Sequence, residues 1–147
     1  MPATGATSDY GLLELDRSQC LALLSSVPVG RLVHTAAAMP AVVPLTFVLL
    51  RESVYIRTSE DAGRRMVHDG SIVAFEADAF DAGHRTGWSV VVLGRADTVT
   101  DPLLLEELVD LPLLPWASGE RQHVVRIRVE HVTGRRVGVG PLPTVTS

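Results

Sequence analysis

Segments of strand length with alternating apolar and polar residues recur along this chain, and they constrain its fold more than any other feature. Residues 54–59 place Val, Ile and Thr on one face and Tyr, Arg and Ser on the other, and residues 122–130 alternate in the same way. Strict alternation indicates strands that bury one face. Because few helices separate the strands, we predict a mainly β fold, a small barrel of six antiparallel strands, instead of a parallel α/β sheet.

The expected elements follow one another through short connections. Asp16 and Gln19 resemble a capping box that opens the first helix. We predict one domain over residues 11–140, a flexible arm over 1–10 and a tail over 141–147. The predicted helices are 16–26, 60–68 and 102–110, and the predicted strands are 31–36, 39–50, 53–58, 71–77, 86–99 and 122–130.

Composition excludes several classes of function. All 13 basic residues are arginine and no lysine occurs in the 147 residues, so there is no Schiff-base or P-loop lysine. The net charge of −4 argues against a nucleic-acid binder. No apolar run reaches the ~20 residues that span a bilayer, and the first residues lack the regions of a signal peptide. We therefore expect a cytoplasmic protein without membrane contact.

One strand is apolar on both faces. Val90, Val91, Val92 and Leu93 are consecutive, whereas a small barrel buries only one face of each strand. The outward apolar side chains need another cover. A homodimer is the simplest explanation, and we predict one.

The junction between strand 53–58 and helix 60–68 gathers groups that bind phosphate. Hydroxyls, helix N–H groups and guanidinium groups all bind phosphate dianions. Two acidic residues, Glu60 and Asp61, favour the alternative of an ordinary capped helix start with solvated arginines. The candidate phosphate ligands are Arg57, Thr58, Ser59, Arg64 and Arg65.

A proline interrupts the apolar strand VVPLTF, residues 42–47. Proline cannot donate to a sheet ladder, so it belongs at an edge or a bulge, where backbone groups stay available to a ligand. A planar heterocycle rich in N–H and C=O groups could use them. The alternative is an edge proline that only discourages aggregation. The candidate ligand contacts are Val43, Pro44, Leu45 and Thr46.

Two tryptophans are further candidates. Trp88 can stack on an aromatic ring and Ser89 can hydrogen-bond to it, although a core tryptophan is the alternative. Trp116 lies in the segment PWASGERQH, which could also be a rigid turn. The five histidines lack the HxH and HxxxH spacings of metal ligands, and no GxSxG motif is present. We therefore predict neither a metal site nor a hydrolase.

The order of these segments resembles the pyridoxamine 5′-phosphate oxidase-like flavin-binding split barrels. The similarity covers roughly residues 12–138 and is closest to the small actinobacterial-type and nitroimidazole-reductase-like members. The segments that carry it are GRLVHT, MPAVVPLTFVL, VYIRTSEDAGRR, VAFEADAFDAGHRTGWSVVVLGRA and VRIRVEHVTGRRV.

The resemblance implies a homodimer with two FMN sites at the subunit interface. It implies that residues 42–46 run along the flavin ring and that Arg57-Thr58-Ser59 and Arg64-Arg65 hold the phosphate. Trp88, Ser89 and Trp116 are the candidates for contacts from the partner subunit. The oxidases use a lysine on the strand matching 42–47, where this chain has Thr46 or Phe47. The resemblance therefore does not transfer their substrate.

We expect an FMN-dependent oxidoreductase that acts on a small organic acceptor. One alternative is a deazaflavin-dependent reductase of the same fold, whose acidic cofactor tail would need a basic groove. Arg64, Arg65, Arg135 and Arg136 could supply that groove. Two further hypotheses are a non-catalytic flavin-binding or sensor protein and a structural dimer with an empty site.

Overall fold

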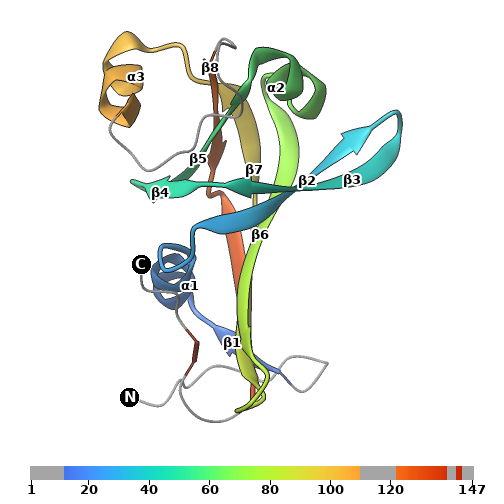
Figure 1. The fold of residues 1–147 in the computed structure, drawn as a ribbon, viewed down its shortest axis with the longest axis vertical. Helices are drawn as coiled ribbons and strands as arrows, with labels where there is room; N and C mark the ends of the chain where they lie inside the picture. Colours follow the sequence, from blue (N-terminus) through green and yellow to red (C-terminus); the bar gives the residue numbers. More distant parts are fainter. Residues whose placement is uncertain (1–11, 110–121, 139–141, 144–147) are drawn as a thin grey trace.

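One antiparallel sheet, strongly curled, forms the body of the molecule (Figure 1). The computed structural model describes residues 12–109, 122–138 and 142–143. These residues form β1 (Leu13–Leu15), α1 (Arg17–Leu24), β2 (Val29–Ala36), β3 (Met39–Thr46), β4 (Val48–Leu50), β5 (Ser53–Ser59), α2 (Glu60–Met66), β6 (Ser71–Asp81), β7 (Thr86–Thr98), α3 (Pro102–Val109), β8 (Gln122–Arg128) and β9 (His131–Val137).

The predicted antiparallel split barrel is confirmed, although the described residues hold nine strands and not six. The short strand β1 pairs with β9, and β9 also pairs with β7. The predicted arm 1–10 and most of the tail 141–147 lie outside the described residues. Among the described helices, none is long and apolar enough to cross a membrane.

Phe47 breaks the strand that we expected over residues 39–50. Its N–H donates to the Pro28 carbonyl at 3.1 Å. Its ring is buried edge-on against Phe75, with centroids 4.8 Å apart. The break sends the chain from β3, which pairs with β2, to β4, which pairs with β5. These two strands end the order β3-β2-β6-β7-β8-β5-β4, so one residue links the two edges of the sheet.

The long strand β7 changes partner along its length. It pairs with β9 over Gly87–Leu93 and with β8 over Ala96–Thr98. Gly94 lies between the two ladders, and a Cβ at this position would overlap the backbone carbonyl oxygen of Arg128. Because that obstacle is backbone and not a flexible side chain, β7 can pass this point only without a side chain.

The curl of the sheet separates an inner core from outer surfaces. The inner faces bury Leu32, Ile56, Phe75, Trp88 and Val92, and α1 adds Cys20 and Leu24. Asp16 and Gln19 form the predicted capping box at the start of α1. A second cluster lies outside the barrel, where α3 packs on β5 and β8. It comprises Tyr55, Val99, Leu108 and Val124, with Val48, Leu50, Leu104 and Leu105 at its margin.

We predict that Gly94→Ala destabilises the protein by about 1–3 kcal/mol or more, because the added methyl group must displace the Arg128 backbone. Chemical denaturation measures the change. Gly83→Ala, in an exposed turn where the nearest atom to the added Cβ is a side-chain oxygen at 3.3 Å, is the matched control. It should change stability by no more than about 0.5 kcal/mol. Equal stability of the two variants would contradict the role given to Gly94.

Candidate functional site

The β5–α2 junction is a tightly capped helix start. Ser59 is extended, and its hydroxyl oxygen accepts a hydrogen bond from the Ala62 N–H at 3.2 Å. Thr58 is buried, and its hydroxyl donates to the Ser59 carbonyl at 2.6 Å. Both hydroxyls are therefore engaged within the chain. Ser59 acts as the ordinary N-cap that the sequence offered as an alternative.

The three candidate arginines lie in different surroundings. Arg57 faces the outside of the barrel, where its Nη2 donates to the Leu108 carbonyl of α3 at 3.0 Å. Arg64 is exposed, and its Nη2 lies 2.5 Å from the Glu60 Oε1. Arg65 is exposed in the last turn of α2 and forms no ion pair with another described residue. Strand alternation explains why Arg57 lies away from Thr58, since the two side chains point to opposite faces of β5.

Strand β3 lies at the edge of the sheet, as the proline within it indicated. Its ladder pairs with β2, and Pro44 is exposed opposite Arg31. Val43 and Leu45 turn inward to the core, and Thr46 is half-buried. One side of the β3 backbone is therefore available to a planar ligand.

These parts meet at one end of the barrel. Helix α2 packs on β2, β5 and β8, and β3 contacts β5. Met66 and Val67 join the same core cluster as Leu45 and Val43. In Figure 1, α2 and the β2–β3 hairpin lie in the upper half of the view, opposite the β6–β7 turn. This end comprises the inner faces of β2 and β3, the last residues of β5, and helix α2. We call it the barrel mouth.

Trp88 and Ser89 point away from each other. Trp88 is fully buried in the core, and its Nε1 donates to the Pro143 carbonyl at 2.8 Å. It thus occupies the core position that was the alternative to ring stacking. Ser89 lies on the outer face and donates to Glu76 at 3.1 Å. Trp116 lies outside the described residues, so its predicted role stays a prediction.

A polar cluster lies on the outer face of β2, β6 and β7. Arg31 contacts Glu76 at 3.0 Å and Asp78 at 3.1 Å. Burial raises the pKa of Glu76 to about 7, and the hydrogen bond and charge of Asp78 add to the rise, against the opposing effects of Ser89 and Arg31. Two carboxyl groups thus share one guanidinium in partly shielded surroundings, which favours one proton on the pair.

An apolar row crosses the same outer face beside this cluster. Its members lie opposite one another on β3, β2, β6 and β7. The residues of the row are Val42, Val33, Ala74 and Leu93. Val42 is 61% exposed and Leu93 is 44% exposed, whereas Val90 and Val92 fill the core. The outward apolar side chains expected from residues 90–93 are therefore present.

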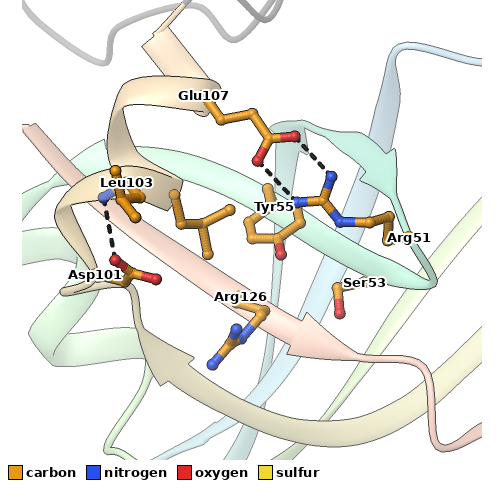
Figure 2. Close-up of a pocket in the computed structure, with 8 residues that line it drawn as sticks. Arg51, Ser53, Tyr55, Asp101, Leu103, Glu107 and Arg126 are labelled. Atoms are coloured by element: carbon orange, nitrogen blue, oxygen red, sulfur yellow. Dashed lines mark hydrogen bonds and ion pairs between the residues drawn. The ribbon is translucent and has the colours of Figure 1, made fainter.

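A polar hollow of about 350 Å³ lies between α3 and the start of β5 (Figure 2). Arg51 spans one side and forms two hydrogen bonds with Glu107, at 2.7 and 2.8 Å. Arg126 at its base is paired with Asp97 at 3.2 and 3.3 Å. Both cations are thus already compensated. The other lining residues are Ser53, Tyr55, Asp101, Leu103 and Leu104.

Two histidines near the mouth were not predicted as site residues. His123 on β8 lies 3.1 Å from the Thr98 hydroxyl through Nε2, and its ring occupies the space above Gly63 of α2. His34 on β2 is 8% exposed, and its buried Nδ1 has no hydrogen-bond partner among the described residues. Strand alternation could have identified His34 in the sequence, because it places this residue on the inner face, between the outward-facing Val33 and Thr35.

Comparison with known proteins identifies relatives of this chain. The family model described as pyridoxamine 5′-phosphate oxidase matches residues 16–136. The uncharacterized protein Rv0080 of Mycobacterium tuberculosis is 40% identical over 138 residues, covering 86% of this chain and 86% of the relative. Among solved structures, the FAD binding protein from Mycobacterium smegmatis is 35% identical with a TM-score of 0.72, covering 86% of this chain and 98% of that one. An FAD-binding protein from Mesorhizobium loti is 25% identical with a TM-score of 0.68, covering 85% and 97%.

We predict that Glu76→Gln stabilises the protein at pH 8 and leaves its stability unchanged near pH 4. The ordinary glutamate pKa is about 4.3, and that of Glu76 in the folded chain is about 7. Between these values the folded state binds more protons than the unfolded state. Stability therefore falls as the pH rises from about 4.3 to 7, and the variant lacks this fall. Melting temperatures measured across this range test the prediction, and parallel curves for wild type and variant would contradict it.

Proposed function

Because the chain belongs to the pyridoxamine 5′-phosphate oxidase family, we propose that it is a flavin-binding homodimer that acts as an oxidoreductase on a small organic acceptor. The observation that carries this proposal is the 35% identity, over 86% of the chain, to an FAD binding protein with the same fold. FMN, expected from the sequence, and FAD share the isoalloxazine ring and the phosphate next to its ribityl chain. The proposal is therefore a flavin nucleotide of either kind.

The residues of the barrel mouth fit such a ligand. The free edge of β3 offers backbone groups to the polar rim of a flavin ring, and Val43 and Leu45 supply apolar contact beside it. Arg65 is the cation best placed to bind phosphate, since Arg64 is compensated by Glu60 and Arg57 is bonded to α3. A charge-assisted hydrogen bond is worth about 1.5–3 kcal/mol.

The flavin and the protein residues around it would have different roles. A bound flavin would supply the hydride or electron transfer. The protein would bind the phosphate through Arg65, orient the ring along β3 and exclude water with Val43 and Leu45. A sensor that binds flavin without turnover would use the same contacts. Steady turnover of a nicotinamide donor with an artificial acceptor distinguishes the enzyme from the sensor.

The deazaflavin alternative fits the charges less well. Its long acidic tail would need a continuous basic groove from the phosphate site onward. Arg135 and Arg136 lie on β9, which pairs with β1 and β7, whereas α2 packs on β2, β5 and β8. Glu60 and Asp61 add two carboxylates to the first turn of α2. These features favour a flavin over a deazaflavin.

We predict that the freshly purified protein is yellow, with the two absorbance bands of an oxidised flavin. Heat release and chromatography of the cofactor identify it as FMN or FAD. Titration of the cofactor-free protein with FMN, FAD and a deazaflavin gives the three dissociation constants. Tightest binding of the deazaflavin, or no binding of any of the three, would overturn the proposal.

The same titration tests the phosphate contact. Arg65→Ala should weaken flavin binding by about 10–100-fold, the equivalent of one charge-assisted hydrogen bond, without lowering the melting temperature. Arg57→Ala should lower the melting temperature, because it removes the bond to α3. Arg95→Ala, an exposed arginine on β7, is the matched control and should change neither quantity. Unchanged flavin affinity in Arg65→Ala would contradict the assignment of Arg65.

We predict that the protein in solution has twice the 15.8 kDa mass of one chain. The partner would cover the apolar row of Val42, Val33, Ala74 and Leu93 on the outer sheet face. Leu93→Arg, which introduces a charge into this row, should yield monomers with little loss of core packing, since Leu93 is 44% exposed. Light scattering after size exclusion measures both masses. A wild-type mass of 15.8 kDa would contradict the proposed dimer.

A further inference from the structure

His34 carries a buried polar atom that the described part of the chain leaves without a partner. The residue is 8% exposed, and its buried Nδ1 has no hydrogen-bond partner among the described residues. Such atoms are rare in folded proteins, because the lost hydrogen bond to water is not replaced. A leucine or phenylalanine would fill the same place without this penalty. The presence of histidine at this position therefore needs an explanation.

The position of His34 relates it to the barrel mouth. It lies opposite Ala41 of β3, on the same inward face of β2 as Leu32. It lies one residue beyond Val33, the last residue of β2 that pairs with β6. From that point β2 and β3 leave the body of the sheet as a hairpin, and α2 packs on β2. The imidazole thus belongs to the inner surface between β3 and α2.

The chemistry of an imidazole suits the edge of a planar heterocycle. A neutral imidazole has one N–H donor and one acceptor nitrogen, and either tautomer can present the required atom at Nδ1. The rim of a flavin ring carries both C=O acceptors and an N–H donor. We propose that His34 is a ligand-contacting residue of the barrel mouth, whose Nδ1 hydrogen-bonds to the rim of the bound flavin ring. This inference rests on the proposed flavin function.

Stability and affinity should change in opposite directions when the nitrogen is removed. In cofactor-free protein, His34→Phe eliminates the unpartnered atom and should raise the melting temperature by several degrees. The same variant should weaken flavin binding about tenfold, which is the loss of one hydrogen bond of about 1.4 kcal/mol. It should also shift the absorbance bands of the bound flavin, because a hydrogen bond at the ring rim is lost. A residue that only packs in the core would leave affinity and spectrum unchanged.

The experiment uses the full chain in cofactor-free and flavin-loaded forms. His34→Gln, which keeps a donor and an acceptor, should retain more affinity than His34→Phe. His34→Leu, which also lacks the ring nitrogens, serves as the test if the phenylalanine variant does not fold. His84→Gln, in the exposed β6–β7 turn, is the matched control and should bind flavin like wild type. Wild-type flavin affinity and spectrum in His34→Phe or, failing that, in His34→Leu would overturn this inference. Absence of flavin binding by the wild type would instead overturn the proposed function.

Discussion

The curl of the sheet depends on β7 passing from one partner strand to another at Gly94. On one side of Gly94, β7 pairs with β9, and on the other it pairs with β8. The backbone of Arg128 lies where a side chain at position 94 would be. This close approach brings β8 and then β5 round the barrel, toward the edge formed by β3. Without it, β3, β5 and α2 would not meet at one end, and there would be no barrel mouth.

Local patterns predicted most of the elements but not their junctions. The alternation in β5 and β8, the two-residue connection between the strands predicted over 39–50 and 53–58, and the capping box at Asp16 all depend on residues close in sequence. Each of these features appears in the structure. The break at Phe47 was missed because apolar residues continue on both sides of it. Its cause is tertiary, since the Phe47 ring packs on Phe75 and its N–H reaches Pro28. Strand β1 was missed because its three residues form a strand only through pairing with β9.

Local patterns likewise predicted some features of the candidate site and missed others. The edge position of Pro44 followed from the lack of an N–H in proline, a property of the residue itself. The separation of Arg57 from Thr58 also follows from the two-residue period of a strand, although the sequence offered them as one phosphate-binding group. No local pattern predicts that Arg57 donates to the Leu108 carbonyl, 51 residues further along the chain. Trp88 belongs to the core for a similar reason, since its indole nitrogen bonds to Pro143.

On β2 and its neighbouring strands, His34 and the Glu76–Asp78 pair depart from the rule that shielded polar atoms are hydrogen-bonded and charges are balanced. They lie on opposite faces of the sheet. His34 faces inward with an unpartnered nitrogen, whereas Glu76 and Asp78 face outward and share Arg31. Arg126, by contrast, is paired with Asp97, so these two exceptions lower the stability of the isolated chain. Sequences are expected to break local rules where function compensates for the loss. The inner exception lies at the proposed flavin site and the outer one beside the proposed dimer face, so the two losses of stability coincide with the two surfaces where binding can offset them.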